Sequence, residues 1–336
     1  MTVSVAVAAY NGEKYIKEQL TSILNQTVKP QEVIICDDGS TDSTVKICKD
    51  FISENRLDNW FVFENEENKG YCFNFYGAIE KCKCYVIFLS DQDDKWRENK
   101  VERMMETLKE NNDIYVLSSR YDVIDSFGNV IENSGITYLG DKFDGSIEYL
   151  DFDSFIGCSY IRGFSLCFKK EIKEKLKPID FKSLLSHDWY ICMLGTVLGK
   201  TAVLNEKLGF YRYHFNNVSL SDMTRKTFLG DREKRKKGLN ESIEGHSYLL
   251  EFDLSVKDRK QTEKFIKLEK KRLKFLNNKN PFLWLCLIFS LNLYKRYYKS
   301  LKGGIRVWIG DFCYAYNINF KKCRNVRFRH FLDSRF

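Results

Sequence analysis

The segment VSVAVAAYNGEKYIKEQLTSIL, at residues 3–24, decides the fold. Its first part, Val3 to Ala9, is a short run of apolar and β-branched residues, which predicts a strand. Asn11 and Gly12 then mark a turn, and residues 13–25 carry apolar side chains at helical spacing. The segment therefore predicts a strand, a turn and a helix in succession.

The same pattern recurs through the first hundred residues. We expect further strands at 32–36, 60–64 and 85–90, and further helices at 44–51, 74–81 and 99–108. Strands that are apolar along their whole length and alternate with helices are typical of a mainly parallel sheet with helices on both faces. The predicted fold class is therefore α/β.

Polar residues follow three of these expected strands. Tyr10 and Asn11 come after the first, Asp37 and Asp38 after the second, and residues 91–94, with the sequence DQDD, after the strand at 85–90. Ligands of parallel sheets bind beyond the carboxyl ends of the strands. We therefore expect the three clusters to converge on one rim of the sheet, where a ligand would bind.

Length and composition restrict the class of protein further. The chain has 336 residues, enough for about two domains. Its 43% hydrophobic and 30% charged residues exclude collagen-like, low-complexity and wholly disordered chains. Eleven cysteines without any Cys-x-x-Cys or paired Cys/His motif fit neither a complete disulfide framework nor a zinc ribbon, so we expect reduced, mostly buried thiols. No basic segment precedes the first apolar run, so we predict no signal peptide and a cytoplasmic location.

Charge divides the chain in two. Residues 1–221 hold 26 Lys and Arg against 34 Asp and Glu, whereas residues 222–336 hold 28 against 12. We expect a first domain at 1–221 and a basic, mostly helical region at 222–336 that faces polyanions, either membrane phosphates or nucleic acid. The apolar run FLWLCLIFSL, at 282–291, has half of the ~20 residues that cross a bilayer, so a transmembrane helix is not expected.

Two of the rim clusters carry carboxylates that could bind a ligand. Asp91, Asp93 and Asp94 would repel one another unless a cation lay among them, and Mg²⁺ or Mn²⁺ takes such oxygen ligands and commonly bridges them to a diphosphate. Asp38 could accept a hydrogen bond from a nucleobase or a ribose hydroxyl. The alternative for both clusters is a polar turn that caps the following helix.

Two histidine-containing segments could supply further chemistry. In His187-Asp188-Trp189, an Asp beside a Trp suits a partly desolvated general base, although a helix cap is the alternative. His214 could be a metal ligand or a phosphate donor, or an ordinary loop residue. The chain contains no Gly-x-Gly-x-x-Gly after a strand and no P-loop motif, so dinucleotide binding and P-loop chemistry lose their main support.

Six segments taken in order resemble the family-2 glycosyltransferases with a GT-A fold, in particular the rhamnosyltransferase-like bacterial enzymes that assemble surface polysaccharides. The resemblance spans about residues 3–219. The segments are VAVAAYNGEKYIKEQLTSILNQT (5–27), VIICDDGSTDST (33–44), ENKG (67–70), FLSDQDDKW (88–96), SHDWY (186–190) and YRYHFNNVS (211–219).

This resemblance implies a role for each matching position. Asp188 corresponds to the catalytic base, Asp93 and His214 to the ligands of Mg²⁺ or Mn²⁺, and Arg162 to the segment that lines the donor and acceptor pocket. The remaining matches are nucleotide-sugar contacts, namely Ala9, Tyr10, Asn11, Asp38 and Asp91. His187 departs from the family, because many members carry Glu beside the base.

The expected function is a metal-dependent, inverting transfer from a UDP- or dTDP-sugar to a glycan or lipid-linked glycan of the cell surface. The alternative is a GT-A-fold protein that binds in polysaccharide assembly without catalysis. In the basic region, aromatic residues such as Trp284, Phe289, Tyr294 and Tyr297 interleave with Lys and Arg, which suits the inner membrane surface. Burial of that segment against the first domain is the competing interpretation. We expect a peripheral protein at the cytoplasmic face, without nucleic acid as a partner.

Overall fold

The computed structural model describes residues 1–132, 142–157, 161–177, 186–214, 232–297 and 300–318. The chain forms two compact units. The first, here the sheet unit, comprises Met1–Phe155 and Ser159–His214, and the second, here the helical unit, comprises Ile156–Cys158 and Phe215–Phe336. The boundary expected from charge, between 221 and 222, lies outside the described residues.

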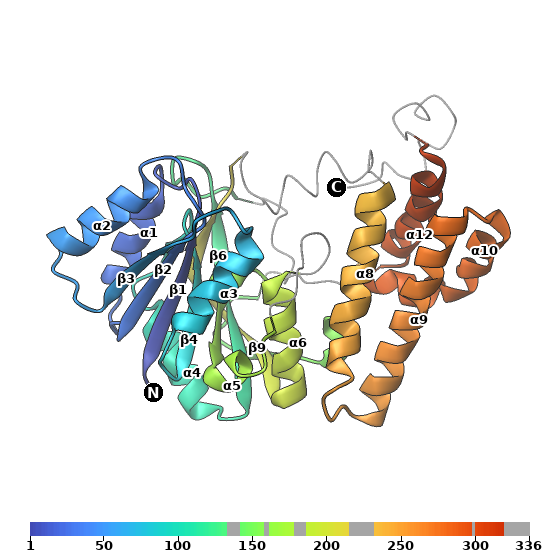
Figure 1. The fold of residues 1–336 in the computed structure, drawn as a ribbon. Helices are drawn as coiled ribbons and strands as arrows, with labels where there is room; N and C mark the ends of the chain where they lie inside the picture. Colours follow the sequence, from blue (N-terminus) through green and yellow to red (C-terminus); the bar gives the residue numbers. More distant parts are fainter. Residues whose placement is uncertain (133–141, 158–160, 178–185, 215–231, 298–299, 319–336) are drawn as a thin grey trace. The chain divides into compact units, whose positions relative to one another are not determined.

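The sheet unit contains nine described strands in one sheet (Figure 1). The strands are β1 (Val3–Ala9), β2 (Glu32–Asp37), β3 (Trp60–Glu64), β4 (Val86–Asp91), β5 (Lys95–Trp96), β6 (Ile114–Ile124), β7 (Ile147–Leu150), β8 (Leu166–Lys169) and β9 (Lys200–Arg212). The helices are α1 (Ile16–Leu24), α2 (Thr44–Glu54), α3 (Tyr71–Lys81), α4 (Lys100–Glu110), α5 (Lys170–Lys173) and α6 (His187–Leu198), with short 3₁₀ turns at Phe152–Ser154 and Gly163–Ser165.

The elements predicted for the first hundred residues are confirmed. The four expected strands are β1 to β4, and the four expected helices are α1 to α4, with ends that differ from the prediction by three residues or fewer. The strands are apolar along their length because helices cover both faces of the sheet.

The sheet as a whole is mixed. Its order is β3-β2-β1-β4-β8-β6-β9-β5, and β7 also pairs with β9. Strands β3, β2, β1 and β4 are parallel, as predicted. Beyond them, β8 runs antiparallel to both β4 and β6, whereas β6 pairs in parallel with β9. Six of the nine described strands therefore share one direction, and the expectation of a mainly parallel sheet holds; β5, β7 and β8 run the other way. The chain enters β8 from a 3₁₀ turn rather than from a crossover helix, which permits the reversed direction.

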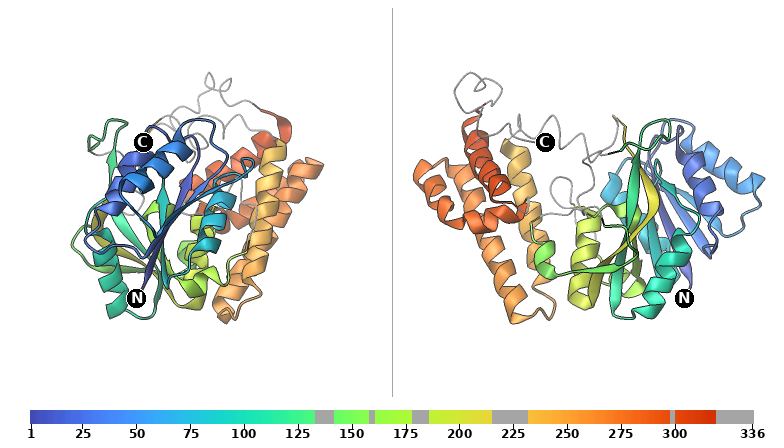
Figure 2. Two further views of the ribbon diagram at one scale, coloured as in Figure 1. Left: turned by 60° about the vertical axis from the view of Figure 1, so that its left-hand side comes forward. Right: turned by 180° about the vertical axis from the view of Figure 1, so that it is seen from behind.

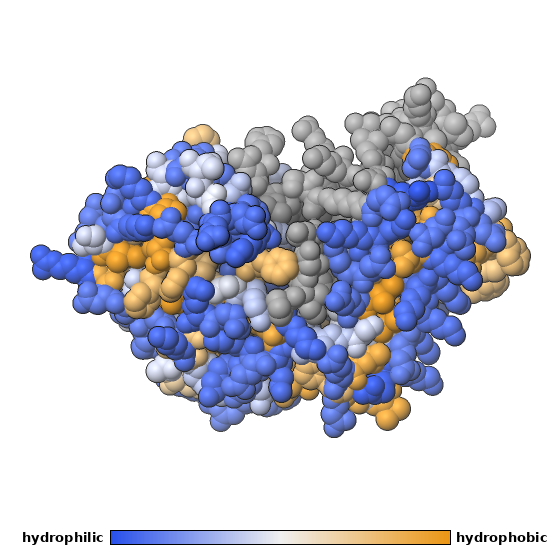
Figure 3. Space-filling view, viewed as in Figure 1, coloured by the Kyte–Doolittle hydropathy of each residue, from blue (hydrophilic) through white to orange (hydrophobic). Residues whose placement is uncertain are grey.

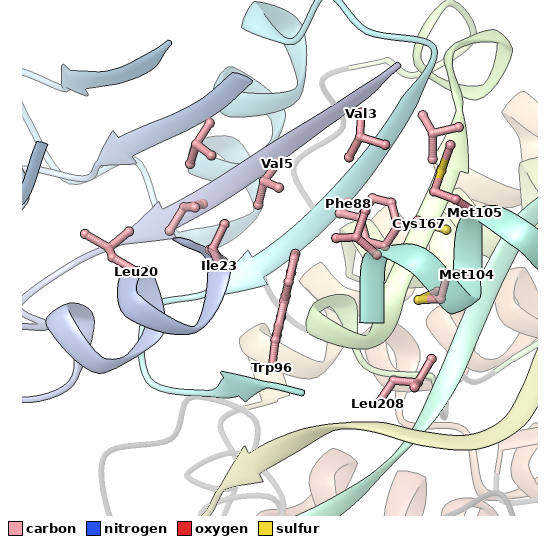
Figure 4. Packing of buried hydrophobic residues seen from close by; sticks show 14 of the residues in the cluster. Val3, Val5, Leu20, Ile23, Phe88, Trp96, Met104, Met105, Cys167 and Leu208 are labelled. Carbon is pink, nitrogen blue, oxygen red and sulfur yellow. The ribbon is translucent and has the colours of Figure 1, made fainter. Parts of the chain in front are cut away.

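Alternate residues of β1 face opposite layers of helices. Val3, Val5 and Val7 belong to a core that also contains Leu20 and Ile23 of α1 (Figure 4). Helices α2 and α4 contribute to the same core, whereas α3 and α6 pack on the other face of the sheet (Figures 1 and 2). The two helical layers hold the strand ends rigidly, which fixes the positions of the loops that follow them.

The helical unit is built from α8 (Arg232–Leu249), α9 (Val256–Asn278), α10 (Pro281–Cys286), α11 (Leu291–Tyr294) and α12 (Leu301–Tyr316), with 3₁₀ segments η4 (Leu287–Ser290) and η5 (Lys295–Tyr297). Its core includes Phe265, Leu268 and Phe275 of α9. At its centre the Asp311 carboxylate binds Arg272, with Nε–Oδ2 and Nη2–Oδ1 distances of 2.6 and 2.8 Å. None of the described helices is long and apolar enough to span a bilayer.

The cysteines that the structure describes are free thiols, as expected. Six of them are buried, and burial raises the pKa of thiols such as Cys36, to about 11, and Cys48, to about 12. Such thiols stay protonated and pack as small apolar side chains.

Candidate active site

The register of the parallel strands brings the predicted clusters to one rim. Ala9 of β1 lies opposite Asp37 of β2, and Ala8 lies opposite Asp91 of β4. The loops after these three strands therefore begin side by side. The Asp38 amide also donates to the Ala9 carbonyl over 2.8 Å, which extends the contact between the first two loops beyond the sheet.

The side-chain amide of Gln92 fixes the first loop. Its Oε1 accepts from the Tyr10 amide over 2.7 Å, and its Nε2 donates to the Tyr10 carbonyl over 2.8 Å. The next residue, Asn11, adopts a positive φ of 47° and accepts from the Thr41 amide over 2.9 Å. The exposed Tyr10 ring is thus held by backbone contacts at the rim. Gly12 leaves room for Gln92, because a Cβ there would lie 2.2 Å from its Oε1.

The Asp38 carboxylate is buried and organises the segment that follows β3. It accepts hydrogen bonds from the Asn65 side chain over 3.0 Å, from the Lys69 amide over 2.9 Å and from the Gly70 amide over 2.8 Å. Gly39 and Gly70 have φ values of 75° and 89°, which favour glycine. Three of the roughly four acceptor positions of this carboxylate are therefore occupied within the chain.

Asp93, in the DQDD turn, forms a pair with His214. The His214 Nε2 and the Asp93 Oδ2 lie 2.8 Å apart, and both side chains are largely but not fully buried. The His214 ring stacks on Tyr15, with centroids 5.3 Å apart. Two residues that are distant in sequence, one after β4 and one after β9, thus offer a carboxylate and an imidazole to the same point.

Arg212, at the end of β9, locks the DQDD turn in place. Its Nε donates to the Asp93 carbonyl over 2.8 Å, its backbone amide donates to Asp94 Oδ1 over 2.8 Å, and its Nη2 binds Glu18 Oε2 at 2.6 Å. The side chain is almost completely buried. The sequence alone does not single out Arg212 or Gln92, because no motif distinguishes a clamping residue from its neighbours before the strands are paired.

The carboxyl groups of the DQDD turn lie close together, and the positive charges around them do not balance their negative charge. Burial, followed by the charges of Asp93 and Asp188, raises the pKa of Asp91 to about 7. Burial and the charges of Asp93 and Asp91 also raise the pKa of Asp94 well above its usual range, and its Oδ2 makes no hydrogen bond within the described part of the chain. Lys100, which donates to the Phe164 carbonyl over 2.6 Å, is buried nearby, and its burial lowers its own pKa to about 7.

Asp188 lies in the first turn of α6. Its Oδ1 accepts from the Trp189 amide over 2.6 Å and from the Ser186 hydroxyl. Burial raises the pKa of Asp188 to about 7, although the hydrogen bond from Trp189 and the positive charge of Arg162 lower it. Arg162 also lowers the pKa values of Asp91 and Asp94, so its guanidinium acts on both clusters of carboxylates.

Other residues of the sheet unit position Arg162. Its Nε donates to the Tyr121 hydroxyl over 3.1 Å, and its guanidinium lies 4.0 Å from the centroid of the Tyr211 ring. Tyr121 and Tyr211 belong to a small aromatic cluster with Phe164. This cluster holds the positive charge where it can act on both Asp91 and Asp188.

His187 stands next to Asp188 in an aromatic environment. Its ring stacks on Phe75, with centroids 4.2 Å apart, and lies edge-on to Tyr71 at 6.0 Å. Burial lowers the pKa of His187 to about 3, so the imidazole is neutral. Neither of its ring nitrogens has a hydrogen-bond partner among the residues that the structure describes. A Cβ at Gly163 would lie 2.7 Å from Nε2, so glycine permits this placement.

The protein residues at the rim could hold a divalent cation only together with atoms of a bound ligand. Within the described ranges, no group of three or more His, Cys, Asp or Glu side chains is arranged to hold a metal ion. Asp93 and His214 offer one oxygen and one nitrogen ligand, a set that Mn²⁺ accepts. Oxygens of a bound diphosphate would have to complete the coordination.

The structure therefore brings most of the predicted site residues to one region. Asp91, Asp93, Asp188 and Arg162 act on one another electrostatically, and His214 joins them through Asp93. Asp38 is placed at the neighbouring loop, where its contacts are with the segment at 65–70. The roles of all these residues stay predictions.

Known proteins resemble this chain in sequence and in fold. The profile of the family described as "Glycosyl transferase family 2" matches residues 4–170. The dTDP-rhamnosyl transferase RfbG of Shigella flexneri is 31% identical over 230 residues, which cover 63% of this chain and 72% of that protein.

Two solved structures share the fold. TarS of S. aureus, in complex with UDP-GlcNAc, has a TM-score of 0.63 at 16% identity and covers 97% of this chain and 93% of its own. The mannosyltransferase PcManGT from Pyrobaculum calidifontis, in complex with GDP-Man and Mn²⁺, has a TM-score of 0.52 at 16% identity, with coverage of 96% and 87%.

These comparisons confirm the GT-A fold and the enzyme class expected from the sequence. The two structures are too distant in sequence to show more than the fold. The family profile and the similarity to RfbG over most of its length carry the assignment. On these grounds the chain belongs to glycosyl transferase family 2.

Proposed function

We propose that this glycosyltransferase moves a sugar, with inversion, from a UDP- or dTDP-sugar to a hydroxyl of a growing, lipid-linked cell-surface polysaccharide. Its relative RfbG is described as a dTDP-rhamnosyl transferase, and TarS was crystallised with UDP-GlcNAc, which supports nucleotide sugars of these two kinds. The enzyme would act at the cytoplasmic face of the membrane as a peripheral protein, with no nucleic acid as a partner.

A single observation carries the catalytic part of the proposal. Asp188 is a carboxylate whose pKa is raised to about 7, within electrostatic range of Asp91 and of Arg162. A general base works best when its pKa is near the operating pH. The arrangement suits Asp188 to the removal of a proton from an acceptor hydroxyl.

The proposed reaction assigns one proton transfer to the chain. An Asp188 carboxylate oxygen takes the proton of the acceptor hydroxyl while the acceptor's own oxygen attacks the anomeric carbon of the donor sugar, and the bond between that carbon and the nucleoside diphosphate breaks. The attack comes from the face opposite the leaving nucleoside diphosphate, so the configuration inverts. Hydrogen bonds from the Trp189 amide and the Ser186 hydroxyl orient the carboxylate.

The loops at the rim would hold the nucleotide. Ala9, Tyr10 and Asn11 line the first loop, and the Gln92 amide keeps its backbone in place. Asp38 retains one acceptor position beside its three internal hydrogen bonds, which suffices for one contact with a nucleobase or ribose. Asp91 and Arg162 would face the sugar diphosphate.

Asp93 and His214 would hold Mg²⁺ or Mn²⁺. Their mixed oxygen and nitrogen donors, and the Mn²⁺ in the complex of PcManGT, support a divalent cation at this position. When bound, such a cation neutralises negative charge that develops on the leaving diphosphate. The carboxylates of the DQDD turn would otherwise repel that diphosphate.

A transfer assay tests the proposal. The purified chain is incubated with UDP-, dTDP- and GDP-sugars and a lipid-linked acceptor, and both nucleotide release and glycan product are measured. Asp188→Asn should lower the transfer rate about 10²- to 10⁴-fold, whereas Asp50→Asn, an exposed position on α2, should leave it unchanged. A chelator should abolish transfer until Mg²⁺ or Mn²⁺ is returned. Donor binding without any product would favour the non-catalytic alternative.

A further inference from the structure

The helical unit exposes an unusual apolar surface. Along α10 and η4, Phe282 is 72% exposed, Leu285 51%, Ile288 42% and Phe289 90%. We call these four residues the apolar patch. Figure 3 shows apolar residues at the right-hand edge of the view, where Figure 1 draws α10. Phe282 and Leu285 lie three residues apart on α10, and Ile288 and Phe289 follow in the 3₁₀ segment η4, so the four exposed side chains lie on consecutive turns of one segment.

The opposite face of the same segment is also apolar and is fixed in the helical unit. The Trp284 ring stacks on Trp308 of α12, with centroids 4.1 Å apart and planes at 4°. Each indole Nε1 donates to the backbone carbonyl of the other tryptophan, over 2.9 and 3.0 Å. Leu287 is buried beside them. The inner face of this segment packs within the helical unit, so the apolar patch is left facing outward.

Two aromatic residues that the sequence predicted at the membrane surface lie in the interior of the helical unit. Tyr294 and Tyr297 are buried, and their hydroxyls donate to Asp311 and Glu269 over 3.0 Å in each case. They stabilise the interior of the helical unit. The candidate membrane surface thus narrows to the apolar patch.

The charge around the apolar patch has a single sign. From Lys270 to Gly310 the sequence contains no Asp or Glu, and it contains nine Lys and Arg residues besides Arg272, which is buried against Asp311. Lys279 and Lys295, on either side of the patch, are exposed. A basic rim around apolar side chains matches anionic lipid headgroups above acyl chains. Two copies of the chain would bring like charges together at this surface, which disfavours a second copy as its occupant.

We propose that the apolar patch inserts into the surface of an anionic lipid bilayer and anchors the chain there without spanning it. The Phe and Leu side chains would enter the interface, and the flanking Lys and Arg residues would bind lipid phosphates. This inference names the surface behind the peripheral membrane location in the proposed function. It rests on that function only for the lipid-linked nature of the acceptor.

Vesicle flotation of the full chain tests the anchor. The probes are vesicles of phosphatidylcholine alone and vesicles that also contain phosphatidylglycerol. The wild type should float with the anionic vesicles, and high salt should reduce binding. Phe282→Gln and Phe289→Gln should each lower the partition coefficient about tenfold, because each removes one inserted aromatic side chain. The matched control is Phe127→Gln, which changes a phenylalanine of the sheet unit that is 87% exposed.

The outcomes separate the anchor from the enzyme. Nucleotide release from a soluble donor should be the same in both patch variants, so loss of flotation with intact release supports the anchor alone. Equal flotation of the wild type and of the double variant that combines Phe282→Gln with Phe289→Gln would overturn it, as would wild-type chain that binds neither kind of vesicle. A patch variant that only dissociates a dimer, without any change in lipid binding, would assign the surface to a second copy and also overturn it.

Discussion

Replacing Asp188 with Asn should stabilise the fold at the same time as it destroys the activity. The wild-type carboxyl has a pKa of about 7 in the folded chain, against its usual value of 3.8. This rise means that the charged form costs the folded state about 4 kcal/mol at a pH above 7. Asn keeps an oxygen that can accept from the Trp189 amide, so the variant removes the charge without losing that hydrogen bond.

The direction of the pKa shift of Asp188 determines how the stability difference between the two chains depends on pH. The folded chain holds the Asp188 proton up to about pH 7, whereas the unfolded chain loses it near 3.8. Wild-type stability therefore falls between these values as the pH rises. The advantage of Asp188→Asn should reach its full size, up to about 4 kcal/mol, at about pH 8 and vanish towards pH 4.

Urea unfolding of both chains, followed by tryptophan fluorescence at several pH values, measures this difference. Asp50→Asn is the control, because Asp50 is exposed and solvent screens its pair with Lys46. A variant that is no more stable than the wild type at high pH would refute the reasoning, because Asp188 would then carry no desolvated charge. The same carboxylate predicts that the transfer rate rises with pH through about 7, where the base loses its proton.

Three further substitutions test other contacts. Asp311→Asn should lower the free energy of unfolding by about 3–5 kcal/mol, because it leaves the buried Arg272 unpaired; urea unfolding measures it, and an unchanged midpoint would contradict it. Gln92→Leu should weaken donor binding in calorimetry, because it removes both hydrogen bonds to Tyr10; unchanged affinity would exclude that role. His187→Ala should lower the free energy of unfolding, because it removes a ring that stacks on Phe75 with centroids 4.2 Å apart; an unchanged urea midpoint would contradict this packing role.

The first half of the sheet could be predicted from sequence because its strands are apolar throughout. The long strands β6 and β9 escaped prediction because polar residues interrupt them. In β6, Ser118 and Arg120 are buried, and each finds a partner that is distant in sequence. The Ser118 hydroxyl lies 2.9 Å from that of Ser165, and the Arg120 guanidinium binds the Asn205 side chain at 2.6 and 2.8 Å. No local sequence pattern predicts such pairs of side chains.

In the candidate site, too, local sequence points to some residues, whereas the contacts of others depend on how distant strands pair. Short motifs singled out Asp93 and Asp188 as candidates, because carboxylates after a strand or at a helix start form a pattern that can be read locally; their roles stay predictions. The contacts of Asp38 with the segment at 65–70 depend on how β2 and β3 are placed together, so the sequence, which suggested a ligand contact for Asp38, could not show them as well. Arg212 clamps a turn that precedes it by more than a hundred residues, so only the pairing of β9 makes its position known.

The raised pKa values and the proposed chemistry have one cause. Asp91, Asp93, Asp94 and Asp188 gather in a partly dehydrated region where Arg162 is a cation that acts on three of them. Asp91, Asp94 and Asp188 destabilise the folded chain when they are ionised, because burial removes the solvent that would balance their charge. In the proposed function, a diphosphate would add still more negative charge, and a further cation at the rim would offset it. The imbalance that costs stability is therefore what would create both a cation site at Asp93 and a base at Asp188 that titrates near neutral pH.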